Sequence, residues 1–433
     1  MIKSLQLENL GPCNNMPSIE FGRRINLITG DNGLGKSFIL DVAWWALTRR
    51  WPSELAKRLT GGSMAIPTNP EAKSRILFEV EGKSGPGGYA ATFDRKAQSW
   101  VGKQGRPVNP GLVIYAMVDG SFAVWDPHRN YWRKDAGDEG SERQPPFVFD
   151  AREIWDGLRV GDNQYCNGLL ADWASWQREN GRPFETLKNV LSTLSAPDSA
   201  PLAPGELKRI SIDDARVYPT IRMPYGIDVP LNQCSAGMKR VFALAYLLVW
   251  SWEEHLAAGD VLGEKPANQI TFLMDEIEAH LHPRWQRSIL SSFQNVMKSL
   301  SPSAAVQLIA VTHSPLLLSS LEESFDPEFD AWFDLDFVES EKGATPRVLL
   351  TRREFRRLGD ANSWLRSAAF DLRYPYARRA EAALIAAEEF MAAEDSDTDR
   401  ALAIRSELSQ VLAETDPFWH RWRYIAERKG WLP

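Results

Sequence analysis

The stretch that decides the fold is INLITGDNGLGKS, residues 25–37. Its first five residues predict a short apolar strand, and the remaining eight match the pattern GxxxxGKS/T. Such a loop lets backbone N–H groups converge on phosphate oxygens, and the helix predicted from about Ser37 to Arg49 adds a positive field at its N-terminus. The alternative is a glycine-rich turn with a solvated lysine. The candidate nucleotide-binding residues here are Gly30, Asn32, Gly33, Gly35, Lys36 and Ser37.

A second apolar strand, predicted over Gln269 to Met274, ends in two carboxylates, Asp275 and Glu276. Open parallel sheets bind ligands at the carboxyl ends of their strands. We therefore expect Asp275 to reach a metal ion, directly or through water, and Glu276 to polarise an attacking water. An acidic surface turn is the alternative. His280 and His282 follow, but no third metal ligand lies nearby in sequence, so we expect them in a dimer interface or a hydrogen-bond network.

Two weaker motifs complete the pattern. Ser235 and Gly237 open a predicted helix, where a serine N-cap and backbone N–H groups form an anion site. His313 follows another apolar strand, Val306 to Val311, and a histidine there can hydrogen-bond a γ-phosphate or orient water. A plain helix cap and a structural histidine are the alternatives.

The composition is that of a globular protein, with 44% hydrophobic and 25% charged residues and a formal net charge of −7. This net charge argues against a basic nucleic-acid binder. Cys13, Cys166 and Cys234 lie far apart, which argues against a zinc site or a disulfide framework and fits a reducing cytosol. The longest apolar run, Val241 to Trp252, falls short of the roughly 20 residues of a membrane span. The stretch MIKSLQLENL, residues 1–10, has no apolar run of the kind expected for a signal peptide. A cytoplasmic location is expected.

Buried strands that alternate with helices predict an α/β fold with a mostly parallel sheet. We expect a main domain over residues 1–345 and a helical C-terminal region over 346–433. The main domain is expected to hold an antiparallel β-subdomain at about 50–135, a mixed, partly helical insertion at about 136–230 and the second half of the core at 231–345.

Together the motifs resemble the ABC-type ATPase superfamily, and more narrowly its SMC/RecF/OLD-like branch. GDNGLGKS, DEIEAHLHP and THSP are similar to the phosphate loop, acidic stretch and switch-histidine motif of that branch. The match covers residues 1–45 and 230–320. It implies a P-loop ATPase head that binds ATP and Mg²⁺, hydrolyses ATP and forms a head-to-tail dimer.

The resemblance also implies roles for the candidate residues. In such a dimer two nucleotides lie between the copies, each between one copy's phosphate loop and the other copy's Ser235 and Gly237. The implied catalytic residues are Glu276, Lys36 and His313, and the implied metal ligands are Ser37 and Asp275. The family also uses a glutamine near the metal and water, for which Gln164 and Gln177 are both candidates.

Three departures from the family pattern concern the site. CSAGMKR, residues 234–240, is not the common LSGGQ-like signature, Ile277 replaces the usual Pro, and His282 stands where transporter relatives carry Asp. These departures concern the geometry of the contact that the second copy makes with the nucleotide and the speed of ATP turnover. They do not concern nucleotide binding.

Within the superfamily, several subgroups fit poorly. The chain has no sustained heptads for a rod, no membrane segment for a transporter, and no acidic cluster after His313 for a TOPRIM nuclease. It looks most like stand-alone ATPases of bacterial anti-phage systems, such as the Septu ATPase PtuA and retron-linked ATPases. These act with a separate effector, often a nuclease, and DPFWHRW at 416–422 is similar to their tail.

Three functions therefore compete. The first is an ATPase that dimerises around nucleotide and controls a nuclease-like effector in phage defence. The second is a RecF/SMC-like DNA-repair ATPase that acts on DNA directly, and the third is a nucleotide-locked scaffold that does not hydrolyse. Tight, salt-sensitive DNA binding by the isolated chain would favour the second.

The C-terminal region suggests two surfaces. The first is a run of arginines whose spacing on a helix would make a basic face for nucleic-acid phosphates, with a solvated face paired to acids as the alternative. The second is a set of aromatic residues expected to anchor a partner or a second copy, with a role in the local core as the alternative. The arginines begin with Arg352, Arg353, Arg356 and Arg357, and the aromatics are Phe418, Trp419, Trp422, Tyr424 and Trp431.

Overall fold

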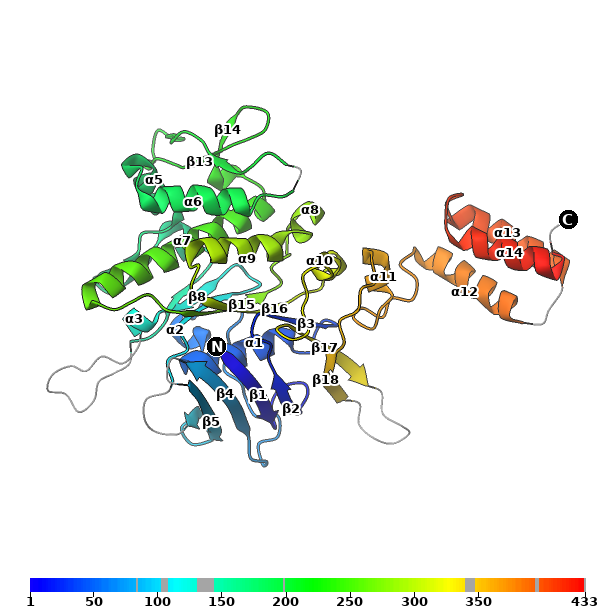
Figure 1. Ribbon diagram of the computed structural model, residues 1–433, viewed down its shortest axis with the longest axis horizontal. Coiled ribbons are helices and arrows are strands. Elements are labelled where there is room, and N and C mark those ends of the chain that lie inside the picture. The colour runs from blue at the N-terminus through cyan, green and yellow to red at the C-terminus, as the bar shows by residue number, and fades with distance from the viewer. Residues whose placement is uncertain are drawn as a thin grey trace. The chain divides into compact units, whose positions relative to one another are not determined.

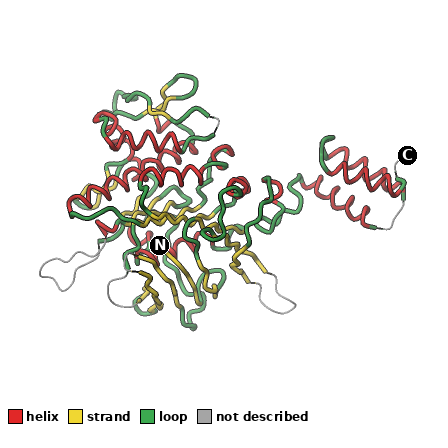
Figure 2. Tube along the Cα trace, viewed as in Figure 1, coloured by secondary structure: helices red, strands yellow, loops and turns green. Residues whose placement is uncertain are grey.

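The computed structural model describes residues 1–82, 85–102, 108–130, 144–197, 199–338, 347–393 and 397–431. The chain divides into two compact units, Met1–Ala361 and Asn362–Pro433. The strands of the described residues all belong to the first unit, whereas the second unit is helical (Figures 1 and 2).

An eight-stranded sheet forms the centre of the first unit. Its pairings β17–β3, β3–β16, β16–β15 and β15–β7 are parallel, whereas β18, β8 and β9 join antiparallel at the edges. All six residues of β3 are buried, as expected for a central strand covered on both faces. In spatial order the strands are β18 (Arg347–Arg353), β17 (Ala331–Val338), β3 (Ile25–Gly30), β16 (Ala305–Val311), β15 (Gln269–Asp275), β7 (Leu112–Ala116), β8 (Phe122–Trp125) and β9 (Phe147–Phe149).

A five-stranded antiparallel sheet lies on one side of this central sheet, with helix α1 (Lys36–Thr48) packed against strands of both. The α1 side chain of Trp44 is fully buried, and Trp45 stacks on Trp51 with ring centroids 5.6 Å apart. These aromatic contacts fix the helix that follows the phosphate loop. In spatial order the strands are β2 (Asn15–Glu20), β1 (Ile2–Glu8), β4 (Arg75–Gly82), β5 (Gly85–Asp94) and β6 (Ser99–Gly102).

Helices cover the opposite face of the central sheet (Figure 1). Phe272 of β15 packs edge-on against Phe293 of α9, with centroids 4.6 Å apart, whereas its neighbour Leu273 belongs to the core on the α1 side. The larger helices here are α5 (Leu169–Glu179), α6 (Arg182–Thr193), α7 (Ala236–Leu262) and α9 (Ile289–Leu300). Elsewhere in the described residues, the short elements not yet named are α2 (Pro52–Leu55), α3 (Pro127–Asn130), α4 (Glu153–Asp156), β10 (Leu158–Val160), β11 (Asn163–Cys166), β12 (Ala203–Pro204), β13 (Thr220–Arg222), β14 (Asp228–Pro230), η1 (Leu231–Gln233), α8 (Pro283–Gln286), α10 (Pro315–Leu321) and α11 (Ala361–Leu365).

The predicted fold class, α/β with a mostly parallel sheet and an antiparallel β-subdomain, is confirmed. The details differ in two places. The antiparallel sheet includes β1 and β2 from the start of the chain, while β7 and β8 belong to the central sheet. The compact units divide at residues 361 and 362 rather than at 345 and 346, because β18 pairs along its whole length with β17.

The first four arginines of the run, Arg352, Arg353, Arg356 and Arg357, do not form a basic helical face. Arg352 and Arg353 lie on β18, where buried Val348 and Leu350 alternate with more exposed residues, the period of a strand. Arg353 lies 3.2 Å from the carboxylate of Asp334. The next two arginines follow the strand, and their guanidinium groups bind Glu354 and the carbonyl oxygen of Glu322.

The second unit packs three helices around an aromatic core. Trp422 and Trp431 are each only 1% exposed, and the ring of Trp431 lies 4.5 Å from that of Phe390. The aromatic residues predicted as interface anchors therefore serve largely as core, apart from Tyr424, which is 60% exposed. The helices are α12 (Arg378–Ala392), α13 (Thr398–Val411) and α14 (Phe418–Lys429).

None of the helices in the described part of the chain has both the length and the apolar character needed to cross a membrane.

Candidate active site

Three neighbouring parallel strands, β3, β16 and β15, end at one edge of the central sheet. Backbone hydrogen bonds continue past the strand ends, from the N–H of Glu276 to the carbonyl oxygen of Val311 (3.1 Å) and from the N–H of Thr312 to that of Ile28 (3.2 Å). The phosphate loop, the acidic pair and His313 follow these three strands directly. The structure therefore brings the phosphate loop, which begins at residue 30, close to residue 313, as expected at the carboxyl edge of a parallel sheet.

The loop after β3 folds around its lysine. The Lys36 ammonium group donates to the carbonyl oxygens of Gly30 (2.8 Å) and Asp31 (2.7 Å). Burial lowers the pKa of Lys36, while the negative charges of Glu276 and Asp275 oppose the shift. Asn32 and Gly33 lie exposed at the tip of the loop. The lysine is thus held inside a loop whose outer side is open to solvent.

Two glycines of this loop are required by close packing as well as by backbone conformation. Gly30 has φ of 133°, and a Cβ there would lie 2.3 Å from the carbonyl oxygen of Leu335. Gly35 has φ of 94°, and a Cβ there would lie 2.7 Å from the ring of Pro12. Residues with a side chain would strain both positions, so the loop geometry depends on glycine.

Asp275 provides a buried carboxylate beside the loop. It is 2% exposed, and burial raises its pKa to about 6 against an opposing hydrogen bond from the Ser37 side chain. Its Oδ1 atom has no hydrogen-bond partner among the described residues, although it is buried. Buried polar atoms are normally satisfied, and a hydroxyl with a carboxylate is a donor set that suits Mg²⁺. Ser37 and Asp275 therefore fit a magnesium ion.

Glu276 and His313 face each other at the solvent side of this edge. The Nε2 atom of His313 lies 3.5 Å from Oε1 of Glu276, and each side chain is about one-third exposed, 30% and 34%. Burial and the positive charge of Lys36 lower the pKa of His313, so the imidazole is neutral at neutral pH. Glu276 adopts a left-handed backbone conformation, with φ of 46°. A glutamate in this setting can reach water while its backbone is held firmly.

The turn at the start of α7, which carries Ser235 and Gly237, contacts the loop after β15 at His280. Ser235 is exposed and caps α7, accepting a hydrogen bond from the N–H of Met238 (3.4 Å). Gly237 packs so closely on this loop that a Cβ would lie 2.5 Å from the carbonyl oxygen of His280. His280 is exposed, and His282 is the N-cap of α8. Ser235 is therefore available on the surface.

Two charged residues at this edge, Arg240 and Glu278, were not predicted from the sequence as site residues. Arg240, on the second turn of α7, donates to the carbonyl oxygens of Val118 (2.9 Å), Met117, Asp275 and Glu276 (3.3 Å each). Glu278 is buried and accepts hydrogen bonds from Thr312 and His313. The only signal in the sequence was a charged residue directly before the apolar run of α7 and a second acid two positions after Glu276.

The two candidate glutamines are engaged elsewhere. The Gln164 amide donates to the carbonyl oxygen of Cys166 (2.6 Å), and the Gln177 amide donates to that of Gly205 (2.8 Å). Gln164 lines two cavities of about 860 and 1090 Å³ that include no residue of the phosphate loop. The structure therefore places neither glutamine beside the metal ligands.

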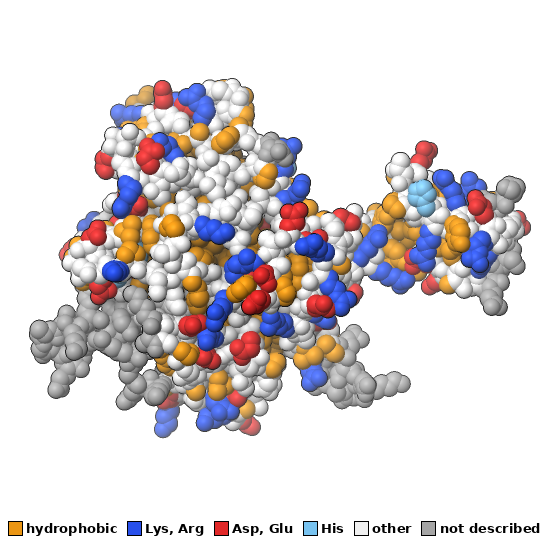
Figure 3. Space-filling model, in the orientation of Figure 1, with side chains coloured by type: hydrophobic (Ala, Val, Ile, Leu, Met, Phe, Trp, Pro, Cys, Tyr) orange, Lys and Arg blue, Asp and Glu red, His pale blue; other side chains and the backbone are white. Residues whose placement is uncertain are grey.

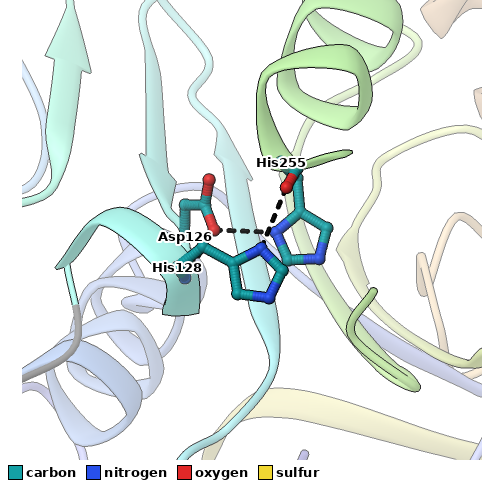
Figure 4. A group of neighbouring side chains, drawn as sticks. All are labelled: Asp126, His128 and His255. Carbon is teal, nitrogen blue, oxygen red and sulfur yellow. Dashed lines mark hydrogen bonds and ion pairs between the residues drawn. The ribbon is translucent and has the colours of Figure 1, made fainter. Parts of the chain in front are cut away.

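A second group of buried polar residues, Asp126, His128 and His255, has the residue types of a metal site (Figure 4). His255 bonds Asp126 through Nδ1 (2.8 Å) and accepts from the N–H of Ala267 through Nε2 (2.8 Å). His128 Nδ1 bonds the carbonyl oxygen of His255 (2.9 Å), and the two rings stack with an interplanar angle of 8°. Because both nitrogens of His255 are used, and parallel stacked rings do not direct lone pairs at one point, this cluster is a structural clamp.

Several known proteins are similar in sequence. Septu protein PtuA from Bacillus thuringiensis is 22% identical over 334 residues, covering 74% of this chain and 73% of that protein. Septu protein PtuA from Bacillus mycoides (strain KBAB4) is 28% identical over 182 residues, 41% of this chain and 22% of that protein. The Retron Vc95 probable ATPase from Vibrio cholerae serotype O1 biovar El Tor is 41% identical over 97 residues, 22% of this chain and 17% of that protein. The matched part of this chain thus spans less than a quarter of the second and third relatives.

Among solved structures, the SMC head domain from Thermotoga maritima is 16% identical and covers 82% of this chain and 99% of that one, with a TM-score of 0.39. A model of the family described as "AAA domain, putative AbiEii toxin, Type IV TA system" matches residues 25–319. This match begins with β3, runs into α10 and includes Lys36, Asp275 and His313. The chain therefore belongs to this AAA-domain family.

Proposed function

We propose that this protein binds and slowly hydrolyses ATP between two copies of the chain, and that it controls a separate effector in bacterial anti-phage defence. The observation that carries the proposal is the meeting of the phosphate loop, two carboxylates and a histidine at one edge of the sheet. The ATPase would comprise the first unit, Met1–Ala361, and act in the cytoplasm, with the helical second unit, Asn362–Pro433, as an accessory region. Membership in the AAA-domain family supports nucleotide binding.

The phosphate loop would bind the triphosphate. Backbone N–H groups at the glycines and the start of α1 favour anions, and the Lys36 ammonium group lies where the loop converges. Ser37 and Asp275 would hold Mg²⁺, which would supply positive charge to neutralise phosphate oxygens. The orphaned Oδ1 of Asp275 would find its partner in this site.

Glu276 would act as the general base. Its carboxylate is one-third exposed, at the carboxyl edge of the sheet, where it can take a proton from an attacking water. His313, neutral and 3.5 Å away, would orient the water or the terminal phosphate. Lys36 would stabilise the charge that develops on the transferred phosphoryl group.

The second copy would complete the site. Ser235 and Ala236 are exposed at the N-terminus of α7, a 27-residue helix, and the buried Gly237 follows them. The N-terminus of a helix favours anions. In a head-to-tail dimer this turn would contact the terminal phosphate bound by the other copy. Each nucleotide would then hold two chains together.

The proposed role in defence rests on the relatives' names. Septu PtuA and the retron ATPase resemble this chain along the stretches reported above. A nuclease-like effector, bound in a nucleotide-dependent way, would supply the antiviral activity. Co-expression with the neighbouring genes, followed by mass measurement with and without ATP, would identify this partner.

The change Glu276→Gln tests the ATPase. We expect ATP binding to persist and phosphate release to fall by about 10²–10⁴-fold, because a general base is lost while shape is kept. Phosphate release and ATP binding are measured on the same preparations, with Glu323→Gln, an exposed glutamate of the first unit, as control. Equal hydrolysis by the variant would refute the assignment. A wild-type protein that binds ATP yet releases no phosphate in any context would be a nucleotide-locked scaffold instead.

A further inference from the structure

Glu278 joins the two strand exits that carry the active-site residues. Its Oε1 atom accepts hydrogen bonds from the hydroxyl of Thr312 and from the backbone N–H of His313, each 2.7 Å long. Glu278 belongs to the turn after β15, whereas Thr312 and His313 follow β16. One carboxylate oxygen therefore fixes the backbone that presents the His313 ring.

The segments on both sides of this contact are held rigidly. Glu276 and His280, which flank Glu278, have left-handed backbone conformations with φ of 46° and 66°. Such conformations are uncommon for residues with side chains and persist only where the surroundings enforce them. On the other side, the Thr312 hydroxyl also accepts from the N–H of Ser314 (3.0 Å), so the Glu278 contact extends along residues 312–314.

Arg240 supports the same corner from helix α7. Its guanidinium group donates to the carbonyl oxygens of Asp275 and Glu276, and the negative charge of Glu278 acts on it. The second carboxylate oxygen of Glu278, Oε2, is buried without a hydrogen-bond partner among the described residues. Burying a carboxylate is costly unless it is paired, so a residue that served only to fill space here would be apolar. The carboxylate is explained by the two groups that its Oε1 atom holds in place.

We propose that Glu278 is a positioning residue for ATP hydrolysis, which holds the backbone of Thr312 and His313 so that the histidine ring faces Glu276. This inference rests on the proposed ATPase function. Glu278 touches neither nucleotide nor water in this role, and acts through His313. Its loss moves the ring away from Glu276 and leaves the phosphate loop intact.

The test compares Glu278→Ala with the near-isosteric Glu278→Gln. A Gln side chain keeps an oxygen that can accept both hydrogen bonds, whereas Ala keeps none. We expect kcat of the Ala variant to fall by about 10- to 100-fold, because small displacements of a catalytic group cost this much, with the KM and Kd for ATP within about threefold of wild type. The Gln variant is expected to stay within about threefold of the wild-type kcat.

A matched control comes from Glu322, whose carboxylate also bridges two loops by accepting the backbone N–H groups of Leu358 (2.9 Å) and Gly359 (3.0 Å), far from the phosphate loop in sequence. Glu322→Ala is expected to leave kcat unchanged. The double variant of Glu278→Ala and His313→Ala is expected to be no slower than the slower single variant, since both act through one ring.

Several results would overturn the proposal: an unchanged kcat in Glu278→Ala, equal damage in the Gln and Ala variants, a parallel loss of ATP affinity, or losses that multiply in the double variant. If the Ala variant does not fold, Thr312→Val replaces it, which removes the hydrogen bonds of the Thr312 hydroxyl with Glu278 and with the N–H of Ser314. The expected loss of kcat is about two- to tenfold. An unchanged kcat in this variant would count against the proposal. The proposed function fails separately, if the wild-type protein itself releases no phosphate.

Discussion

Behind the phosphate loop, one carboxyl group is buried on α1 and takes no direct part in the proposed chemistry. Asp41 is 8% exposed and accepts a hydrogen bond from the Tyr115 hydroxyl on β7 (2.8 Å). Burial raises the pKa of Asp41 to about 7, although the hydrogen bond from Tyr115 opposes this shift. The nearby negative charge of Asp275 adds to the effect. The folded protein therefore binds a proton at Asp41 that the unfolded chain releases at lower pH.

We predict that Asp41→Asn raises the unfolding free energy by an amount that depends on pH. Because the folded pKa is raised above the unfolded value, the stability that protonated Asp41 contributes is lost as pH rises from about 4 through about 7. The gain in unfolding free energy of Asp41→Asn over wild type should be roughly 2–3 kcal/mol larger at pH 8 than at pH 5. Urea unfolding of both proteins at the two pH values measures this difference. A fixed offset from altered hydrogen bonds does not vary with pH, so an equal gain at both values would refute the assignment.

Among the helices and strands, the central ones were predictable from the sequence, whereas some peripheral ones, such as β18, were not. β3, β15 and β16 are apolar runs that end in polar residues, and this pattern alone indicates buried parallel strands and their functional edge. β18 could not be predicted from its own residues, because three of its seven residues are arginines. It forms a strand by pairing with β17, and the sequence does not show this pairing. The break between α8 and α9 falls at Arg287 and Ser288, and neither residue type is a helix breaker such as Gly or Pro.

The same distinction applies to the candidate site. Glu276 and His313 could be proposed because they lie just past the ends of β15 and β16, and Lys36 because of its place in the GxxxxGKS/T pattern. Arg240 and Glu278 could not, because their partners lie on three separate loops, and those contacts depend on how the loops fold. Gln164 and Gln177 had been chosen by residue type without such a positional signal.

The packing of α7 against the loop after β15 can be tested at Gly237. A Cβ there would lie 2.5 Å from the carbonyl oxygen of His280, so Gly237→Ala must push the helix and this loop apart. We expect a loss of about 1–3 kcal/mol in stability, as for other overpacked sites, together with slower ATP hydrolysis. Thermal unfolding and phosphate release measure the two effects. Gly88→Ala, where a Cβ would meet no atom within 4 Å, is the control, and equal behaviour of the two variants would contradict the close packing.

At the scale of the whole molecule, the distribution of charged and aromatic residues bears on which partners, nucleic acid or a second copy of the chain, are expected. On the face shown in Figure 3, Lys and Arg are interspersed with Asp and Glu, so the described residues of this face form no broad basic surface for nucleic acid. The aromatic tail residues Trp422 and Trp431 are core residues of the second unit. The feature that still calls for a second chain is the exposed Ser235 turn at the start of α7.

Phosphate release by a mixture of two inactive variants, Lys36→Ala and Ser235→Arg, tests this dimer most directly. Each variant alone lacks one half of every site. In an equal mixture half of the dimers combine the two variants, and each mixed dimer has one intact site, so about a quarter of the wild-type rate should return. A mixture that stays as inactive as its components, although mass measurement shows mixed dimers, would contradict the account.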